Sequence, residues 1–474
     1  MSFITSPGVI VPPLTAGGVA YGTGSQAMVT SAGTAGQFLQ SAGAGVPVFA
    51  DAGSEVVRVA RTSNTVLVKV NNGNLIDITS GTFSQTFTAA ATLDDGWFCY
   101  IRNNGTGVIT LDPDSSETID GLTSYAMYTG EVRLVQCTGT AFFSVVLSPF
   151  FAKFTTSGTF VTPPGYTQLY LRMWGGGCGA SAGEGNTSGT NRNGGGGGGG
   201  GGQNFGNITA PAAGTSVTVT IGAGSAGSSS GTNTSTGGTT TFTGYMSAFG
   251  GGGGDGGSSA AGIAGGGSLS APDGSTGGSP RPLILYREGG TVKQIELIAG
   301  INMGGAGPNA MFATSTSANS AASAGCSEHG GSGGGGGATG ANDPIMCFGG
   351  KSLTGPTGGG QGSGISSGES VRTAGQGGGV GYAINNSSGG YVAGSAMGGG
   401  AAGGVGAVGA AGSLLSSGSG GGGGGGGGNA AGAGYAGGAG SVPGGGGGGG
   451  GAGLVTGGAG GNGGNGQLNI IGIT

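Results

Sequence analysis

Glycine is distributed very unevenly along this chain of 474 residues. Residues 1–150 contain 18 of the 131 glycines, and residues 151–474 contain the other 113. The longest uninterrupted runs lie at 194–202, 250–254, 333–337, 420–428 and 444–451. Collagen would need glycine at every third position and far more than the 16 prolines present. An α-helix is also disfavoured, because glycine costs about 1 kcal/mol relative to alanine in a helix interior.

Charge divides the chain in a related way. Residues 1–150 carry 5 basic and 10 acidic side chains, which give the whole net charge of −5, whereas residues 151–474 carry 8 of each sign. Disordered segments usually combine low hydrophobicity with high net charge. The glycine-rich part instead has scattered Ala, Val, Leu and Ile and almost no charge. We therefore expect it either to be ordered or to aggregate, and we favour order.

Polyglycine II helices are the expected conformation of the glycine runs. This threefold helix rises ~3.1 Å per residue and makes no internal hydrogen bonds. Ordering a residue costs ~1–2 kcal/mol, and a hydrogen bond contributes a net ~0.5–1.5 kcal/mol, so a single rod is not stable. The sequence predicts an array of rods that bond laterally, in which only residues without a Cβ let the backbones approach closely.

Short strands are predicted before, between and after the glycine runs. In the first 150 residues they lie at 64–70, 97–101, 108–111, 130–136 and 141–147. The dipeptide Asn104-Gly105 predicts a hairpin between the second and the third. Further strands are predicted at 169–174, 216–221, 283–286, 292–298 and 467–473, with a hairpin at Gly289-Gly290. The predicted fold is mostly β, with polyglycine II rods clamped by short strands and little or no α-helix.

Three zones follow from this pattern. Residues 1–54 are extended pieces joined by glycine turns that could not bury a core alone, so they need a partner. Residues 55–150 form a small β domain. Residues 151–474 form the glycine-rich domain, and the less repetitive stretch 280–350 is the expected place for a specificity insertion.

Several segments resemble bacteriophage tail fibres. Residues 18–24 with 33–47 are similar to a segment common in those fibres, and 101–113 with 117–121 resemble one of their small β domains. Residues 160–166, 171–177 and 238–242 resemble the beginning of the glycine-rich, polyglycine II adhesin domain of these fibres. Residues 460–471 resemble its closing strand. The resemblance implies a homotrimer, attached to other tail or baseplate proteins through its N-terminus. It also implies assembly in the host cytoplasm, a final place in the virion, and a tip that binds the bacterial surface.

Composition argues against several other functions. No basic patch is present, so nucleic-acid binding is not expected, and no apolar run reaches the ~18–20 residues of a membrane helix. The N-terminus lacks the basic segment of a secretory signal, since the first charged residue is Asp51. The five cysteines are odd in number and widely spaced, which suits a reducing compartment.

Enzymatic and metal chemistry are not expected either. Four carboxylates lie within nine residues: Asp112, Asp114, Glu117 and Asp120. They could suggest a calcium-binding loop or the carboxylate pair of a glycosidase. Because their spacing lacks the glycine and the ligand order of an EF-hand, we interpret them as a solvated turn. Cys326, His329 and Cys347 lack a fourth zinc ligand. His329 is the one histidine and has no apolar run beside it to bury a base. No catalytic residue, metal or cofactor is therefore predicted.

Surface recognition remains as the expected activity. Bulky side chains on the loops that join the rods would contact an outer-membrane protein or a surface polysaccharide. The candidates are Tyr245, Phe249, Tyr286, Arg287, His329, Tyr382, Tyr391 and Tyr435. Each could instead fill a gap in the lattice. Two alternatives stay open: a structural spacer or decoration of the virion without receptor contact, and an ice-binding or cell-surface glycine-rich protein.

Overall fold

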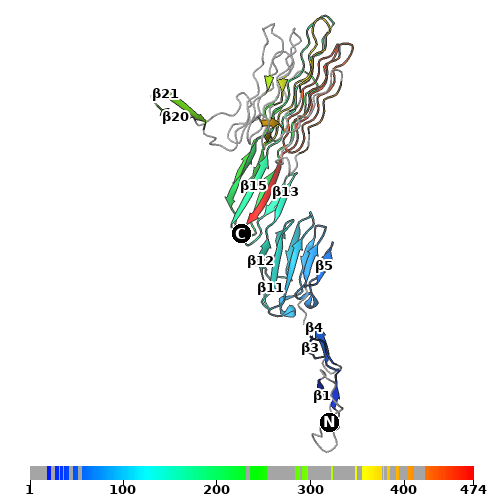
Figure 1. The fold of residues 1–474 in the computed structure, drawn as a ribbon, viewed down its shortest axis with the longest axis vertical. Helices are drawn as coiled ribbons and strands as arrows, with labels where there is room; N and C mark the ends of the chain where they lie inside the picture. The colour runs from blue at the N-terminus through cyan, green and yellow to red at the C-terminus, as the bar shows by residue number, and fades with distance from the viewer. Residues whose placement is uncertain are drawn as a thin grey trace, which may run out of the picture.

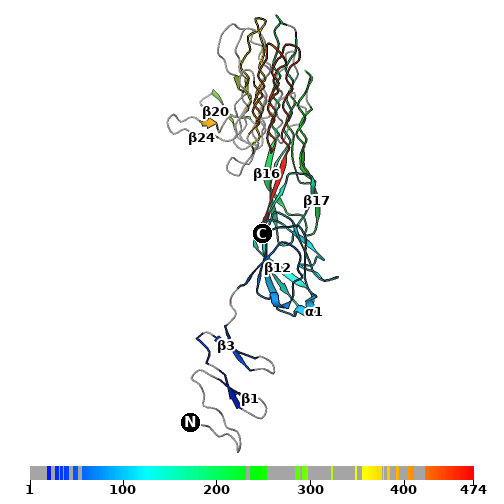
Figure 2. The same ribbon diagram turned by 90° about the vertical axis from the view of Figure 1, so that its right-hand side faces the viewer.

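The chain folds into an elongated molecule, with the hairpin strands of residues 20–51 at one end and the glycine-rich rods at the other (Figures 1 and 2). The computed structural model describes residues 56–253 except 187 and 231–234, residues 355–377 except 376, residues 404–411 except 410, and residues 422–474. It also describes parts of 19–51 and short paired strands between 283 and 393.

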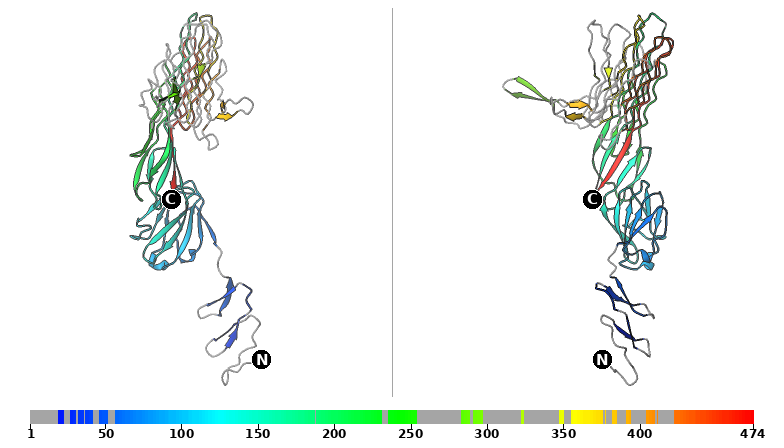
Figure 3. Two further views of the ribbon diagram at one scale, coloured as in Figure 1. Left: turned by 60° about the vertical axis from the view of Figure 1, so that its left-hand side comes forward. Right: turned by 45° about the vertical axis from the view of Figure 1, so that its right-hand side comes forward.

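Two isolated hairpins form the N-terminal end. The strand β1 (Ala20–Gly22) pairs with β2 (Ala27–Val29), and β3 (Gln37–Gln40) pairs with β4 (Val48–Asp51), both antiparallel. Figure 3 shows them as separate two-stranded units below the first larger domain. Phe38 is 48% exposed. A lone hairpin is marginally stable in water, so these elements have little packing of their own.

The β domain, residues 56–148, follows the hairpins. It contains a five-stranded sheet in the order β12-β11-β8-β6-β5 and a three-stranded sheet in the order β10-β9-β7. Its elements are β5 (Arg58–Arg61), η1 (Lys69–Asn71), β6 (Leu75–Ile78), β7 (Ser84–Thr86), α1 (Ala90–Leu93), β8 (Phe98–Asn103), β9 (Ile109–Asp112), β10 (Tyr125–Met127), β11 (Val132–Cys137) and β12 (Phe142–Ser148). The inward residues of both sheets, such as Ile76, Ile101 and Leu111, form one fully buried apolar core.

Two sequence predictions for this domain are wrong. The predicted hairpin at Asn104-Gly105 does not form, because β8 is already paired on both sides, by β11 and β6. The Asn103 side chain closes a different turn by donating to the carbonyls of Gly107 (2.8 Å) and Met127 (3.0 Å). The chain then crosses to the other sheet, where β9 pairs with β7 and β10.

The predicted strand at 64–70 is the second error. Only Leu67 makes a β-bridge, to Phe87, and the 3-10 helix η1 begins at Lys69. Val70 is 81% exposed. The alternation of β-branched residues therefore has no sheet to pack against. The hairpin predicted from 130–136 and 141–147 is confirmed, as the antiparallel pair β11–β12.

Two four-stranded sheets form the base of the glycine-rich domain. One has the order β13-β26-β15-β16 and the other β14-β17-β18-β19. Their strands are β13 (Phe151–Phe154), β14 (Gly158–Val161), β15 (Gln168–Trp174), β16 (Gln203–Thr209), β17 (Ser216–Thr220), β18 (Thr240–Phe242), β19 (Met246–Ala248) and β26 (Gln467–Ile473). The C-terminal strand β26 lies between β13 and β15, and a second apolar core lies between the sheets. The predicted strands at 169–174, 216–221 and 467–473 are confirmed.

Beyond this base, the glycine-rich segments run as rods whose hydrogen bonds repeat every three residues. In rod 175–184, one set of N–H groups donates to rod 457–466 over 2.8–2.9 Å: those of Gly177, Ala180 and Gly183. The next set donates to rod 193–202 over 2.8–3.0 Å: those of Cys178, Ser181 and Glu184. The third direction faces residues 222–238. A three-residue repeat with only lateral bonds is that of a threefold polyglycine II helix.

The rods pack in layers, and the central rod 444–453 bonds to six others. It donates to rods 175–184, 355–364 and 434–440 and accepts from rods 193–202, 422–428 and 457–466. Shorter or peripheral rods lie at 222–228, 235–239, 249–253, 371–377 and 404–409. The prediction of laterally bonded rods clamped by strands is confirmed for the described tracts. The glycine run at 333–337 lies outside the described residues.

Close backbone packing explains the glycines of the interior rods. A Cβ added to Gly450 would lie 1.9 Å from the carbonyl oxygen of Gly458, and one added to Gly425 would lie 1.6 Å from that of Gln361. No side chain tolerates such contacts. Rod 175–184 departs from the all-glycine pattern and carries four buried side chains, those of Cys178, Ala180, Ser181 and Ala182.

Six further strands, in three pairs, complete the described fold. The strands β20 (Leu283–Glu288) and β21 (Thr291–Glu296) form the predicted hairpin around Gly289-Gly290. The pairs β22 (Ala322–Ser323) with β23 (Cys347–Phe348) and β24 (Tyr382–Ile384) with β25 (Tyr391–Ala393) are shorter. The expected fold class, mostly β with almost no helix, is confirmed.

Candidate functional site: the tip of the glycine-rich domain

Four turns gather at the end of the rods farthest from the sheets. Rod 175–184 leaves β15 and rod 457–466 enters β26, so the turns at their other ends lie far from the base. Isolated bridges join Gly185 and Asn429 to Gly453, and join Arg192 to Ile365. These bridges place four turns side by side, and we call them the tip: residues 185–192, 365–371, 429–433 and 453–456.

A buried arginine ties two tip turns together. The side chain of Arg192 is fully buried, and its guanidinium forms an ion pair with the carboxylate of Glu369. Its Nη1 also donates to the carbonyl oxygen of Gly453 over 3.3 Å. The backbones of Arg192 and Ile365 exchange two hydrogen bonds of 2.8 Å. Segments separated by more than 170 residues in the sequence are therefore held in one arrangement.

Glu369 is the acceptor at the centre of this arrangement. Its Oε1 accepts from the N–H of Gly189 (2.7 Å) and from the hydroxyl of Ser188 (3.0 Å). The Gly189 N–H, followed by the Arg192 side chain, holds the pKa of Glu369 below its usual value. Glu369 itself has a φ of 59°, a conformation that is uncommon for a residue other than glycine. The turn is thus fixed by the carboxylate rather than by backbone preference.

The outer surface of the tip is polar but almost uncharged. Arg192 and Glu369 are the only charged residues in the four turns, and the turns contain no aromatic residue. Hydroxyl and amide side chains are exposed or half-exposed there: Asn186, Ser188, Thr190, Asn191, Ser367, Ser370 and Thr456. Val455 is 76% exposed. The tip can therefore offer hydrogen bonds and a small apolar contact from a preorganised backbone.

The side chains of three of the eight sequence-predicted site residues lie in the described part of the structure, and these three do not lie together. Tyr245 lies in the turn between β18 and β19, at the sheet end of the domain, with its ring 5.4 Å from that of Phe242. Phe249 is half-buried just after β19, and its carbonyl accepts from Gly202. Tyr435 is half-buried at the start of rod 434–440, close after a tip turn. Of the three, only Tyr435 is near the tip.

The other predicted residues are placed only through their strands. Tyr286 and Arg287 lie in β20, opposite Lys293 and Val292 of β21. Tyr382 begins β24, and Tyr391 begins β25. His329 lies outside the described residues, as does Cys326.

The carboxylate cluster of the β domain serves local structure. Both oxygens of Glu117 accept from the N–H of Ala90 at the start of α1 (2.9 Å). Asp120 accepts from the N–H (2.8 Å) and the hydroxyl (2.6 Å) of Ser144. The turn is therefore more than a solvated loop. Among the described residues, no group of three or more His, Cys, Asp or Glu side chains is arranged to hold a metal.

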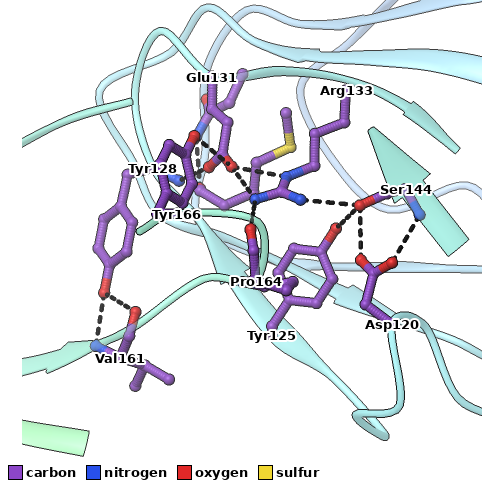
Figure 4. A network of polar contacts seen from close by, with 11 residues as sticks. Asp120, Tyr125, Tyr128, Glu131, Arg133, Ser144, Val161, Pro164 and Tyr166 are labelled. Atoms are coloured by element: carbon purple, nitrogen blue, oxygen red, sulfur yellow. Dashed lines mark hydrogen bonds and ion pairs between the residues drawn. The ribbon is translucent and has the colours of Figure 1, made fainter. Parts of the chain in front are cut away.

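A buried polar network joins the β domain to the glycine-rich domain (Figure 4). Arg133 of β11 donates to Glu131 over 2.7 Å and to the carbonyl of Pro164, in the neighbouring domain, also over 2.7 Å. Glu131 in turn accepts from the hydroxyl of Tyr166 (3.1 Å). Burial raises the pKa of Glu131, and Arg133 only partly offsets this shift. The junction is thus closed by a desolvated ion pair rather than by a flexible linker.

Aromatic packing reinforces the same junction. Tyr128 stacks on Phe160 with centroids 5.1 Å apart, and Phe150 contacts Tyr166 edge-on at 4.9 Å. The hydroxyl of Tyr128 donates to the carbonyl of Val161 (3.1 Å) and accepts from its N–H (2.8 Å). The buried network and these aromatic contacts hold the base of the glycine-rich domain in one orientation on the β domain.

Sequence reasoning missed both Arg192–Glu369 and Arg133–Glu131. Each partner of the first pair lies in a polar turn with no motif around it. The available signal was rarity, because residues 151–474 contain only 8 basic and 8 acidic side chains. A charged residue in such a neutral zone needs a reason, and here the reason is an ion pair across the lattice.

Comparison with known families identifies the central part of the chain. A family model described as a glycine-rich domain matches residues 155–384, beginning directly after β13. Residues 155–384 are therefore a glycine-rich domain. Rods 422–428, 434–440, 444–453 and 457–466 lie beyond the match but belong to the same lattice, as the six-neighbour bonding of rod 444–453 shows. Among curated proteins, no match to the sequence is found. The described residues include no helix of the length and apolarity that a membrane crossing requires.

Proposed function

We propose that this chain is the adhesive end of a bacteriophage tail fibre and binds the host bacterium through the tip. The observation that carries the proposal is the arrangement of four turns, fixed by Arg192 and Glu369, at the end of an elongated molecule opposite its N-terminus. A binding surface works best when it is preorganised, since less conformational entropy is lost on association. The rigid junction supports the same function, because it presents the tip away from the virion.

The N-terminal part would attach the chain to the virion as a homotrimer. The outer face of β12 exposes Phe143, Val145 and Leu147, at 41%, 47% and 53%, and the adjacent strands add half-buried Leu134 and Tyr100 in the same row. A row of exposed apolar side chains on a sheet face favours association. The lone hairpins β1–β2 and β3–β4 would gain their missing packing from neighbouring copies or from tail and baseplate proteins.

Cell binding by the full chain tests the adhesive function. We expect the fluorescently labelled protein to bind a subset of a panel of bacterial strains in flow cytometry. Strains with truncated surface polysaccharide, or lacking single outer-membrane proteins, then identify the ligand class. A correctly folded protein that binds no strain of a broad panel would contradict the adhesive function and favour the structural spacer.

A matched pair of variants assigns binding to the tip. Val455→Asp places a charge on the most exposed apolar side chain of the tip, and Val70→Asp makes the same change at an equally exposed site of the β domain. We expect Val455→Asp to lower the amount of bound protein at least tenfold, and Val70→Asp to leave it unchanged. Equal effects of the two changes would place the binding surface elsewhere.

A further inference from the structure

One face of the lattice is formed by four rods that have no further rod in front of them within the described part of the chain. Gly406 donates to Ala436 of the next rod, Gly437 to Ala459 of the third, and Gly460 to Ser228 of the fourth. This order defines the outer layer: rods 404–409, 434–440, 457–466 and 222–228. Behind it lie the rods that include Gly424, Gly448 and Gly177.

The outer layer differs from the interior in where its side chains lie. Each of its rods has non-glycine residues spaced three apart that are exposed or half-exposed, and we call them the outward rows: Val405 and Val408; Ala436 and Ala439; Ala459, Asn462 and Asn465; Ala223 and Ala226. Val405 and Val408 are 64% and 59% exposed. In rod 457–466 all the other positions are glycine, whereas the central rod 444–453 has a single non-glycine residue, Ala452.

The same face carries backbone groups without partners. Within the described part of the chain, the N–H groups of Ala436, Ala439 and Ala459 donate to no other residue, whereas their neighbours on each rod bond to the layer behind. An open row of backbone N–H donors is a template for adding another chain, as at the edge of a β-sheet. The bare lattice would therefore continue at this face.

We propose that the outward rows of side chains end the lattice and prevent the rods of a second copy from adding to it. In the interior, the lattice spacing leaves no room for a Cβ: one added to Gly437 would lie 1.8 Å from the carbonyl oxygen of Gly448, and one added to Gly461 would lie 2.0 Å from that of Gly438. A layer that approached the outer face at this spacing would meet a Cβ at every third residue of each rod. Hydrogen bonding across the face is thereby blocked, although the backbone groups are present.

Two asparagines add to this effect because their side chains accept hydrogen bonds from backbone N–H groups of the neighbouring rod. The Oδ1 atoms of Asn462 and Asn465 accept from the N–H groups of Gly227 and Gly224, each over 2.9 Å. Both asparagines are exposed and stand three residues apart on one rod. They satisfy backbone donors that another rod would otherwise bind, so the row acts both as a steric block and as a cap.

The test removes the block without touching the interior. The full chain with Val405→Gly, Val408→Gly, Ala436→Gly and Ala439→Gly is compared with the parent chain by light scattering over a range of concentrations. We expect the variant to associate further, with a mass at least twice that of the parent at the same concentration. Four glycines at exposed positions outside the tip and the outer layer, Ala212→Gly, Ala213→Gly, Val66→Gly and Val70→Gly, form the matched control and should leave the mass unchanged.

A milder variant guards against loss of folding. Ala436→Gly with Ala439→Gly removes only two outward methyl groups from one rod, and its circular dichroism and cooperative unfolding establish that it is folded. A rise in association in the pair variant, smaller than that of the fourfold variant, supports the proposal. A folded pair or fourfold variant with the same mass as the parent at every concentration overturns it, as does an equal rise in the control.

Discussion

The β domain and the glycine lattice both have buried interiors. Side chains fill the interior of the first, and backbone fills most of the interior of the second. In the β domain, large side chains such as Ile76, Ile101 and Leu111 are completely buried between two sheets. In the lattice the buried groups are mainly backbone amides, and rod 444–453 bonds to six neighbours with a single side chain, that of Ala452. One region is held by the hydrophobic effect, the other by a dense set of hydrogen bonds between backbones in close contact.

The two regions should therefore be destabilised by opposite kinds of substitution. A core of side chains suffers when a group is removed, because a cavity is left. A lattice without side chains suffers when a group is added, because the carbonyl of a neighbouring rod already occupies the position of the new Cβ. The junction follows a third rule, since its buried ion pair depends on both partners remaining.

The two tryptophans of the chain allow the regions to be followed separately. Trp97 lies in the core of the β domain, and Trp174 is fully buried where β15 continues into rod 175–184. Replacing either with phenylalanine leaves one fluorescent reporter. Denaturant unfolding of these two parent proteins gives the reference free energies for each variant below.

Gly450→Ala should have the largest effect. The new Cβ would lie 1.9 Å from the carbonyl oxygen of Gly458, and rods on all sides prevent the central rod from moving away. We expect a loss of at least about 4 kcal/mol of unfolding free energy reported by Trp174. Gly206→Ala is the control: its Cβ would meet only the Met246 methyl at 3.6 Å, so a loss within about 1 kcal/mol is expected. Similar losses in both would remove the steric basis of the comparison.

Arg133→Met should cause the second-largest loss of stability, and this loss should depend on pH. The change leaves Glu131 buried without its cation and the Pro164 carbonyl without its donor, a type of loss that costs about 3–5 kcal/mol. The folded-state pKa of Glu131 is already raised by burial and should rise further without Arg133. A carboxyl with a raised pKa contributes stability below its unfolded pKa of about 4.3, and this contribution is lost as pH rises.

The variant should therefore recover part of its stability as pH is lowered from 7 towards 4. Unfolding curves at several pH values, followed by both tryptophans, measure this. Lys69→Met breaks the exposed pair with Asp94 and should change stability by less than about 1 kcal/mol. A loss for Arg133→Met that is small, or that grows on acidification, would contradict the role of the junction.

Ile101→Val should have a smaller effect, confined to the β domain. Removing one buried methylene-sized group leaves a small cavity and costs about 0.5–1.5 kcal/mol. The loss should be visible through Trp97, which shares the core with Ile101. An equal loss of the unfolding free energy reported by Trp174 would show that the two regions unfold as a single cooperative unit. The regions would then differ in packing but not in stability.

Glu369→Gln should have the smallest effect on stability and the most local one. The folded-state pKa of Glu369 is lowered by its hydrogen bonds, so its contribution is present above the unfolded pKa of about 4.3 and disappears as pH falls. Parent and variant should therefore differ at pH 7 and converge towards pH 3. Hydrogen exchange of Gly189 and its neighbours measures the loosened turn. A difference that persisted at pH 3 would show that the charge is not what fixes the tip.

Much of the architecture could be predicted from particular residues. The alternation at 169–174 and 216–221 predicts strands because one face of each is buried against the second core. The glycine runs predict rods, because no other residue permits the observed backbone contacts. The candidate site was harder to predict. Aromatic side chains were expected to mark it, but Tyr245 and Phe249 lie at the sheet end, and the turns at the tip contain none.

Sequence alone shows that the glycine runs of residues 151–474 cannot form helices or a side-chain core, because glycine has no Cβ to pack. It also predicts three of the strands that clamp the rods, those at 169–174, 216–221 and 467–473. The fold is needed to know which rods are neighbours, which glycines are interior, and that Arg192 pairs with Glu369 across the tip. Lateral hydrogen bonds between glycine backbones are the same whichever two rods form them, so the sequence of a rod does not indicate its neighbour. Their pairing is set by the sheets at the base, the turns, and the sparse side chains that fit only at particular places.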